Sequence, residues 1–208
     1  MGYILLGEIV ENISGQKLNE LYAEIISTPL GLNNTLMFRP VDEYTSSIIS
    51  DIAATQYCPW RKKLLQGEVD DEHCWLLNGI AGHAGLFGTI HGVMDMCIHI
   101  LNQWKEREKT PAYKNSLLKK ALKKVHKNST WCLGFDTPSA VGSSGGRYLS
   151  KESVGHLGFT GTSFWIDPQK DIIVTLLTNR IHPTRENEKI KKFRPLLHDL
   201  VFQLIETN

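Results

Sequence analysis

The sequence lacks both a strong excess of charge and a long apolar run. Its 23 lysines and arginines and 22 acidic residues leave a net charge of +1, which does not indicate a surface for nucleic acid or for an anionic membrane. No apolar run reaches the ~18 residues that cross a bilayer. The N-terminus has no basic stretch followed by a small-residue cleavage site. We therefore predict no nucleic-acid partner, and the sequence leaves the localisation unknown.

Closely spaced cysteine pairs are also missing, which excludes the common redox and zinc motifs. The four cysteines are Cys58, Cys74, Cys97 and Cys132, and none of them forms a CxxC pair. We expect reduced structural thiols, or one disulfide if the protein is exported. A metal site is conceivable among Asp71, His73, Cys74 and His83, but their spacing fits no standard ligand pattern. The prediction is accordingly that the chain uses no metal and no cofactor.

The composition is that of a globular domain. The chain has 208 residues, of which 41% are hydrophobic and 22% charged, enough for one domain with a sizeable core or for part of a larger one. We predict one domain over 1–208, mainly helical over 1–130, with sheet strands and a C-terminal helix over 131–208. The expected fold class is α+β.

One stretch, Val154–Pro168, organises the remaining chain. It interleaves Gly155, Gly158 and Gly161 with hydroxyl and aromatic residues, and the β-branched run 171–179 follows it. The pattern predicts two strands joined by a turn over 167–170. Glycine weakens a strand and persists where something approaches the backbone closely. We therefore interpret the first strand as the wall of a cleft, with its edge exposed to a ligand.

Apolar spacing predicts the other elements. We expect helices over 3–13 with Gly15 as C-cap, over 18–26, over 90–106, in the lysine-rich stretch 105–128 and over 186–207. The turn-rich stretch 33–78 is expected to contain short helices, including one over 53–65. Residues 131–137 read as a further strand, and the glycine-rich stretch 78–89 as a loop or a tightly packed helix start.

A family resemblance rests on the organising stretch. His156-Leu157-Gly158, followed by Phe-Thr-Gly-Thr-Ser-Phe-Trp-Ile-Asp-Pro, resembles the Lys/His-x-Gly strand of the serine β-lactamase and penicillin-binding-protein family. The match is on the class C side, which includes D-alanyl-D-alanine carboxypeptidases and esterases. Segments 2–11, 29–32, 79–89 and 178–185 resemble family segments in the same order. The resemblance implies a bacterial hydrolase with an antiparallel sheet flanked by helices.

The resemblance also implies a set of site residues. His156 stands where the family has a cation that orients a substrate carboxylate or supports proton transfer. The backbone N–H of Phe159, directly after Gly158, would supply one oxyanion donor. Gly158, Thr160 and Thr162 would line the strand or bind the substrate, which would be a small molecule or a peptide. His83 either faces the cleft or only packs within its glycine-rich turn.

The attacking part of such a site is missing from the sequence. S-x-x-K occurs at 14–17 and at 116–119, and Tyr113-Lys114-Asn115 matches Y-x-N. About one S-x-x-K match is expected by chance, and the Y-x-N match abuts Ser116. A tyrosine and a serine three residues apart on one helix face the same way and cannot form opposite walls of a cleft, so we reject all three matches. In the family, Y-S-N or Y-S-D immediately precedes the segment that resembles 2–7, and Met1 occupies the last position before it here. Met1 is then an internal methionine, a boundary cut for expression or the product of a frame-shift.

Three functions follow as hypotheses. The chain is the C-terminal part of a β-lactamase-like serine hydrolase that acts on a peptidoglycan peptide, a β-lactam or an ester. Alternatively, it is a non-catalytic remnant or binding module, or one half of a split enzyme completed by an N-terminal segment. Without a nucleophile, the chain alone should be inactive. Truncation would also leave a sheet edge unpaired, so we expect poor solubility or self-association through that edge.

Overall fold

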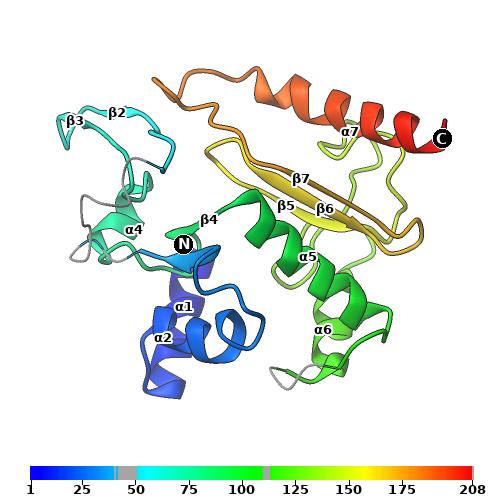
Figure 1. Cartoon of the computed structure of the whole chain (residues 1–208), viewed down its shortest axis with the longest axis horizontal. Helices are drawn as coiled ribbons and strands as arrows, with labels where there is room; N and C mark the ends of the chain where they lie inside the picture. The colour runs from blue at the N-terminus through cyan, green and yellow to red at the C-terminus, as the bar shows by residue number, and fades with distance from the viewer. Residues whose placement is uncertain (40, 42–50, 110–112, 208) are drawn as a thin grey trace. The chain divides into compact units, whose positions relative to one another are not determined.

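A computed structural model describes residues 1–39, 41, 51–109 and 113–207. The chain divides into two compact units. The first unit comprises Met1–Val93 and Ile181–Arg185, and the second comprises Met94–Arg180 and Glu186–Asn208. Helices and antiparallel strands are both present, which confirms the predicted α+β class (Figure 1).

The first unit begins with helix α1, Gly2–Ser14, close to the predicted bounds. Gly15 ends this helix in the left-handed conformation, with a φ of 71°, as its predicted role of C-cap requires. Helix α2, Leu18–Tyr22, continues into the π-helix η1, Ala23–Ser27. The glycine-rich stretch packs directly on α1, because a Cβ at Gly82 would collide with the backbone carbonyl oxygen of Tyr3.

The remainder of the first unit contains two small hairpins and a short helix. Strand β1, Leu36–Phe38, pairs antiparallel with β4, Leu86–Gly88, so the stretch 78–89 contains a strand as well as a loop. Strands β2, Tyr57–Cys58, and β3, Lys63–Leu64, form the second hairpin. Helix α4 spans Glu72–Leu76.

The predicted helix over 53–65 is therefore wrong. Pro59 has no N–H to donate, and Lys62 adopts a positive φ of 54°. The Lys62 N–H bonds the Cys58 carbonyl at 2.8 Å, which closes a tight turn between β2 and β3.

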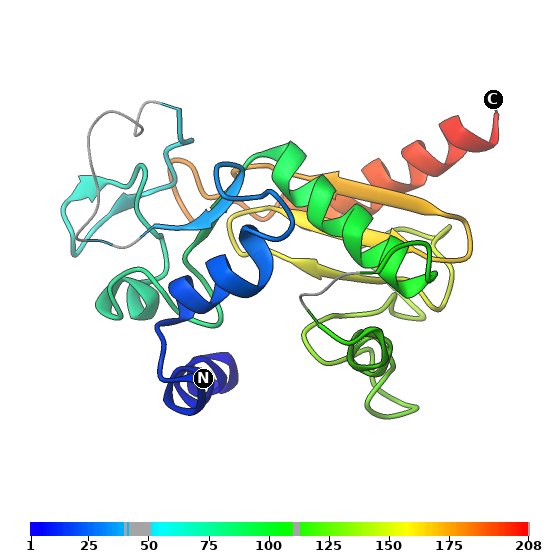
Figure 2. The same ribbon diagram turned by 60° about the horizontal axis from the view of Figure 1, so that its bottom comes forward.

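The second unit is built on a three-stranded antiparallel sheet with the order β5-β6-β7. The strands are Val154–Leu157, Ser163–Asp167 and Ile172–Leu176. The hairpin predicted around 167–170 is confirmed as the β6–β7 connection. Figures 1 and 2 show helices α5 and α7 on opposite sides of this sheet.

The stretch Val154–Pro168 is two strands and not one. The chain turns at 158–162, where the Gly158 N–H donates to the Thr162 carbonyl at 2.8 Å and Gly161 has a φ of 119°. Gly158 and Gly161 thus serve a turn, whereas Gly155 serves close packing inside a strand. Our single-strand interpretation missed the turn because aliphatic and β-branched residues flank it on both sides.

Gly155→Ala should lower the free energy of unfolding by about 1–3 kcal/mol, the usual cost of overpacking a core. A Cβ at this position would meet the Phe164 carbonyl oxygen and lie 2.6 Å from the buried Trp165 ring. Denaturant unfolding measures the change. Gly2→Ala is the matched control, because a Cβ there meets nothing within 4 Å. Equal stability of the two variants would contradict the packing role of Gly155.

Three further helices contribute to the second unit. Helix α5, Ile90–Trp104, starts in the first unit and continues into the second; α6 spans Asn115–Ala121 and α7 spans Ile190–Glu206. The lysine-rich helix is thus much shorter than 105–128. The predicted strand over 131–137 is also wrong, because only two isolated bridges form there, one of them between Asp136 and Gly155.

Helix α7 buries charged and polar side chains and exposes several of its large apolar ones. Its buried residues include Arg194, His198 and Phe202. Large apolar side chains are exposed elsewhere on the helix: Phe193, Leu196, Leu200, Leu204 and Ile205. Across the described residues, no helix combines the length and apolar character that a membrane span requires.

Candidate functional site

The candidate site lies on the edge strand β5 and on the turn that follows it. His156 is exposed near the end of β5, and its Nδ1 lies 3.0 Å from the Leu157 carbonyl oxygen. Gly158 and Thr160 are half-buried in the turn. Thr162 closes the turn, and its Oγ1 occupies the space that a Cβ at Gly158 would need. One short segment therefore carries five of the six predicted site residues.

The edge of β5 that faces away from β6 is partly occupied. Gly155 exchanges two backbone hydrogen bonds with Asp136 there, at 2.8 and 2.9 Å. Main-chain groups alternate between the two edges of a strand, so those of Leu157, the last residue of β5, face the same edge as those of Gly155. The stretch left for a ligand on this edge is therefore the part beyond Gly155, next to His156.

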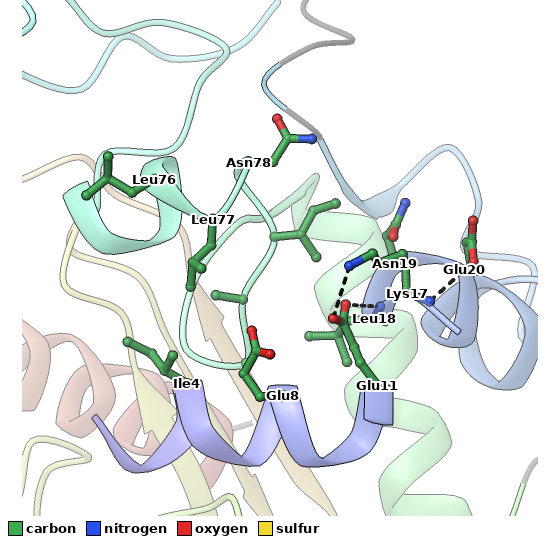
Figure 3. A pocket seen from close by; sticks show the side chains of 14 residues that line it. Ile4, Glu8, Glu11, Lys17, Leu18, Asn19, Glu20, Leu76, Leu77 and Asn78 are labelled. Atoms are coloured by element: carbon green, nitrogen blue, oxygen red, sulfur yellow. Dashed lines mark hydrogen bonds and ion pairs between the residues drawn. The ribbon is translucent and has the colours of Figure 1, made fainter. Parts of the chain in front are cut away.

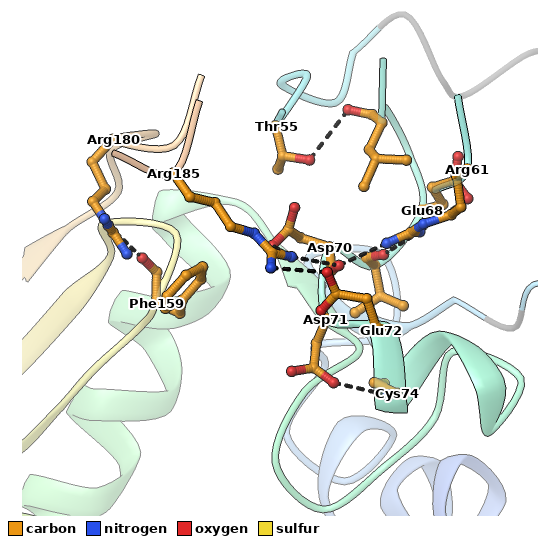
Figure 4. Close-up of polar contacts among 12 residues, drawn as sticks. Thr55, Arg61, Glu68, Asp70, Asp71, Glu72, Cys74, Phe159, Arg180 and Arg185 are labelled. Atoms are coloured by element: carbon orange, nitrogen blue, oxygen red, sulfur yellow. Dashed lines mark hydrogen bonds and ion pairs between the residues drawn. The ribbon is translucent and has the colours of Figure 1, made fainter. Parts of the chain in front are cut away.

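Two arginines and Thr178 hold the β5–β6 turn, and the Thr178 hydroxyl donates to the Gly161 carbonyl at 2.7 Å. The buried Arg194 of α7 donates to the carbonyls of Gly158 and Thr162 at 2.9 and 2.7 Å. Arg180 donates from Nε to the Phe159 carbonyl at 2.8 Å (Figure 4).

The Arg180 guanidinium also lies 4.5 Å from the centre of the Phe159 ring. Burial, and to a lesser extent the positive charge of Arg180, lowers the pKa of Arg194 from its ordinary value.

The sequence analysis missed Thr178, Arg180 and Arg194. The first two belong to a segment that was noted only for its resemblance to the family. Arg194 follows Ile190 by four residues and precedes His198 by four, so the three share one helix face. A charged residue on a buried helix face needs hydrogen-bond partners, so the sequence pattern could have predicted that Arg194 contacts polar groups of another segment.

His83 lies in the first unit. Its Nε2 is 2.8 Å from Oδ1 of Asp71, and the same carboxylate caps α4 by accepting the Cys74 N–H at 2.8 Å. Burial would raise the pKa of Asp71, but the bonds from Cys74 and His83 outweigh it and the pKa is lowered. The geometry gives His83 a clear structural role in fixing the start of α4.

The acidic stretch before α4 belongs to an ion-pair network in the first unit (Figure 4). Arg185 pairs with Asp70 and Glu72, both at 2.8 Å. Arg61 pairs with Glu68 at 3.3 Å and donates to the Asp70 carbonyl at 2.7 Å. These contacts tie distant segments of the unit together and leave the carboxylates engaged with arginines.

A cavity of about 430 Å³ lies within the first unit, between α1, the segment 17–20 and the segment 76–82 (Figure 3). Glu11 borders it and accepts the Leu18 N–H at 2.7 Å. None of the six candidate site residues lines this cavity.

Among the rejected motifs, the first S-x-x-K match has both of its reactive groups engaged elsewhere. The Ser14 hydroxyl donates to the Val10 carbonyl at 2.8 Å, and the Lys17 ammonium lies 3.5 Å from Glu11. Tyr113 precedes α6, so it does not share a helix with Ser116 as the sequence argument assumed. Burial raises the pKa of Tyr113 to about 12. The environment of Ser14 does not prepare a nucleophile, and that of Tyr113 does not prepare a base.

Over residues 1–39, 41, 51–109 and 113–207, no group of three histidine, cysteine or acidic side chains is arranged to hold an ion. The four cysteines are free and buried, as the prediction of reduced structural thiols requires.

Comparison with known proteins defines the family. The family model described as Beta-lactamase matches residues 1–198, so the chain belongs to this family. Proteins of Salmonella typhi and Salmonella gallinarum that are named D-alanyl-D-alanine carboxypeptidase are 27% identical over 202 residues. The match covers 90% of this chain and 46% of each relative. The chain thus spans about half the length of these curated relatives.

Solved structures agree on the fold. A β-lactamase from Mycobacterium bovis superimposes with a TM-score of 0.64 at 17% identity, covering 97% of this chain and 61% of that one. Simvastatin synthase from Aspergillus terreus gives a TM-score of 0.65 at 16% identity, covering 95% of this chain and 53% of that one. The hydrolase EstCE1 gives 0.60 at 16% identity, covering 95% and 54%. At these identities the likeness establishes the β-lactamase-like fold alone.

Proposed function

We propose that this chain forms one wall of the acyl-transfer site of a β-lactamase-family serine hydrolase. The attacking serine and its lysine and tyrosine partners come from polypeptide outside these 208 residues. The substrate class is an acyl compound: a peptidoglycan peptide, a β-lactam or an ester. The observation that carries the proposal is the His156-Leu157-Gly158 segment at the end of an edge strand, with Phe159 in the turn that follows directly.

The proposed roles follow from the chemistry of acyl transfer. A serine hydroxyl attacks the substrate carbonyl, the carbonyl oxygen becomes an oxyanion, and the C–N or C–O bond to the leaving group then breaks. The Phe159 N–H is one donor to that oxyanion. His156, exposed beside it, orients the substrate carboxylate or assists proton transfer. Thr160 and Thr162 line the substrate side of the turn, and His83 remains a further candidate for substrate contact.

The proposal also holds that the chain alone has no acyl-transfer activity. Oxyanion donors and a cation cannot replace a missing nucleophile in a covalent mechanism. Ser14 and Ser116 lie on helices α1 and α6. Neither serine belongs to the β5 segment, and the Ser14 hydroxyl is already bonded to its own helix.

Co-expression with the polypeptide encoded upstream tests this proposal. We expect an in-frame or adjacent reading frame with S-x-x-K and Y-S-N/D motifs. Its product should restore turnover of a nitrophenyl ester or a fluorescent penicillin. His156→Ala should then lower turnover by about 10²-fold or more, as the loss of a proton-transfer group does.

Ser14→Ala and Ser116→Ala are the matched controls and should retain full turnover in the co-expressed protein. An upstream region without these motifs, together with inactivity of every mixture, would favour a non-catalytic binding module. Turnover by the chain alone would contradict the proposal.

Self-association remains part of the proposal. Strand β7 forms the other edge of the three-stranded sheet, and this edge can pair with the same edge of a second copy. Analytical ultracentrifugation of the isolated chain should show dimers, and a clean monomer would count against this.

A further inference from the structure

The β5–β6 turn has all five of its main-chain carbonyls held by three residues that lie outside it. Arg194 Nη2 donates to the carbonyls of Gly158 and Thr162 at 2.9 and 2.7 Å. The carbonyls of the three residues between them accept from Arg180 Nε at 2.8 Å, from the Arg180 backbone N–H at 2.8 Å and from Thr178 Oγ1 at 2.7 Å. Backbone bonds within the turn add to these, from Gly161 to Gly158 and from Gly158 to Thr162.

A hydrogen bond that fixes the carbonyl of one residue also fixes the direction of the N–H of the following residue. The peptide unit is planar and trans, so the carbonyl of one residue and the N–H of the following residue point in opposite directions. The bond from Arg194 to the Gly158 carbonyl therefore directs the Phe159 N–H away from Arg194. The bond from Arg180 Nε to the Phe159 carbonyl likewise directs the Thr160 N–H away from that guanidinium.

The guanidinium of Arg194, which holds two carbonyls of the turn, is a buried cation. Arg194 is only 7% exposed. Among the described residues it pairs with no carboxylate, and its Nη2 donates to two carbonyls of the turn. A guanidinium on the carbonyl side polarises the peptide unit and strengthens its N–H as a donor, because hydrogen bonds in a chain reinforce one another. The buried charge of Arg194 therefore makes the N–H groups of the turn stronger hydrogen-bond donors.

We propose that Arg194 and Arg180 are positioning residues that aim the N–H groups of Phe159 and Thr160 at a negatively charged oxygen of the substrate. This inference rests on the proposed function, because the oxyanion is the group that Phe159 would serve. Arg194 sets the Phe159 N–H, and Arg180 sets the Thr160 N–H. Neither arginine needs to touch the substrate.

Arg194→Lys tests the proposal in the isolated chain labelled with ¹⁵N. A lysine ammonium lacks the planar fork that reaches two carbonyls at once. We expect the amide signals of Phe159 and Thr160 to shift and their hydrogen exchange to accelerate, while signals of α1 and α4 keep their positions. The control is Arg107→Met, which removes an exposed arginine bonded to the Asp171 carboxylate at 2.6 Å and should leave the turn signals unchanged.

Arg180→Met provides a second variant, because Arg180 is only half-buried and its loss is less of a threat to folding. It should move the Thr160 amide more than the Phe159 amide. Turn amides that stay unchanged in both arginine variants would overturn the proposal, whatever happens to the melting temperature.

In the co-expressed enzyme, Arg194→Lys should lower kcat by about 10²-fold with KM within about twofold, as misplacement of a catalytic donor does. A lower melting temperature with unchanged kcat would show a purely structural role and overturn the inference. If the unmodified co-expressed protein is inactive, the proposed function fails. The amide measurements on the isolated chain then still decide whether the arginines orient the turn.

Discussion

Replacing Glu68 by alanine should lower the free energy of unfolding by about 3–5 kcal/mol, the typical cost of removing one partner from a buried ion pair. The side chains of Glu68 and Arg61 are only 5% and 3% exposed. Arg61 also lies over the rings of Trp60 and Trp75, at 5.3 and 5.6 Å from their centres. Without Glu68, a cation is left in this apolar environment with only carbonyl partners.

Urea unfolding measures this effect as a lower midpoint at unchanged slope. Glu106→Ala is the matched control, because Glu106 pairs with Lys119 on an exposed surface and should leave the midpoint in place. Glu68 also pairs with Lys63 at 2.8 Å, so a Glu68→Ala midpoint equal to that of the control would show that its two ion pairs together contribute no more than a surface contact.

Asp167→Ala is expected to lower the free energy of unfolding by about 3 kcal/mol, since it leaves four partly buried donors without an acceptor. The Asp167 carboxylate is completely buried. It accepts from the N–H and the hydroxyl of Ser150, both at 2.8 Å, and from the N–H groups of Gln169 and Lys170 at 3.0 and 3.1 Å. The same contacts close the β6–β7 turn.

The Asp167 contribution should depend on pH. Burial raises the pKa of this carboxyl, but the N–H groups of Ser150 and Lys170 outweigh it and hold the pKa below its ordinary value. A lowered native pKa stabilises the folded state above the unfolded value of about 3.9. The contribution is lost as the pH falls below that value, through the native pKa.

The stability difference between the unmodified chain and Asp167→Asn tests the sign of this dependence. Asparagine keeps the shape of the side chain but does not titrate, so the difference should be largest near neutral pH and shrink below about pH 4. A difference that stays constant from pH 7 to pH 3 would contradict the assigned pKa direction.

Local pattern was sufficient to predict several of the regular elements of the fold. Helix α1 and its Gly15 cap follow from apolar spacing and from the freedom of glycine at positive φ. The β6–β7 hairpin follows from two apolar runs separated by a turn at Pro168. These features depend on residues that are close together in the sequence.

The errors arose where distant residues decide the structure. The turn at 158–162 is held by Arg194, more than 30 residues further along the chain, and no local pattern reveals that contact. The stretch 131–137 has the composition of a strand, but it makes only isolated bridges, one of which joins Asp136 to Gly155. Local propensity is a weak guide when tertiary contacts override it.

In the candidate site, too, the sequence identified residues that are contiguous and missed residues that come from distant segments. His156, Gly158 and Phe159 were identified because their motif is contiguous in the sequence. The residues that hold the motif in place, Arg180 and Arg194, come from other segments and were missed. A contiguous motif can locate one wall of a site, but the groups that complete or orient it have to be found in three dimensions.

Intact-mass spectrometry of the isolated chain, incubated with a fluorescent penicillin and with a nitrophenyl ester, tests the central claim most directly. The account predicts an unmodified mass and no release of nitrophenol above the background of buffer. An acyl adduct on a serine of this chain, formed with turnover and lost on mutation of that serine, would contradict it, since the attacking group would then lie within these 208 residues.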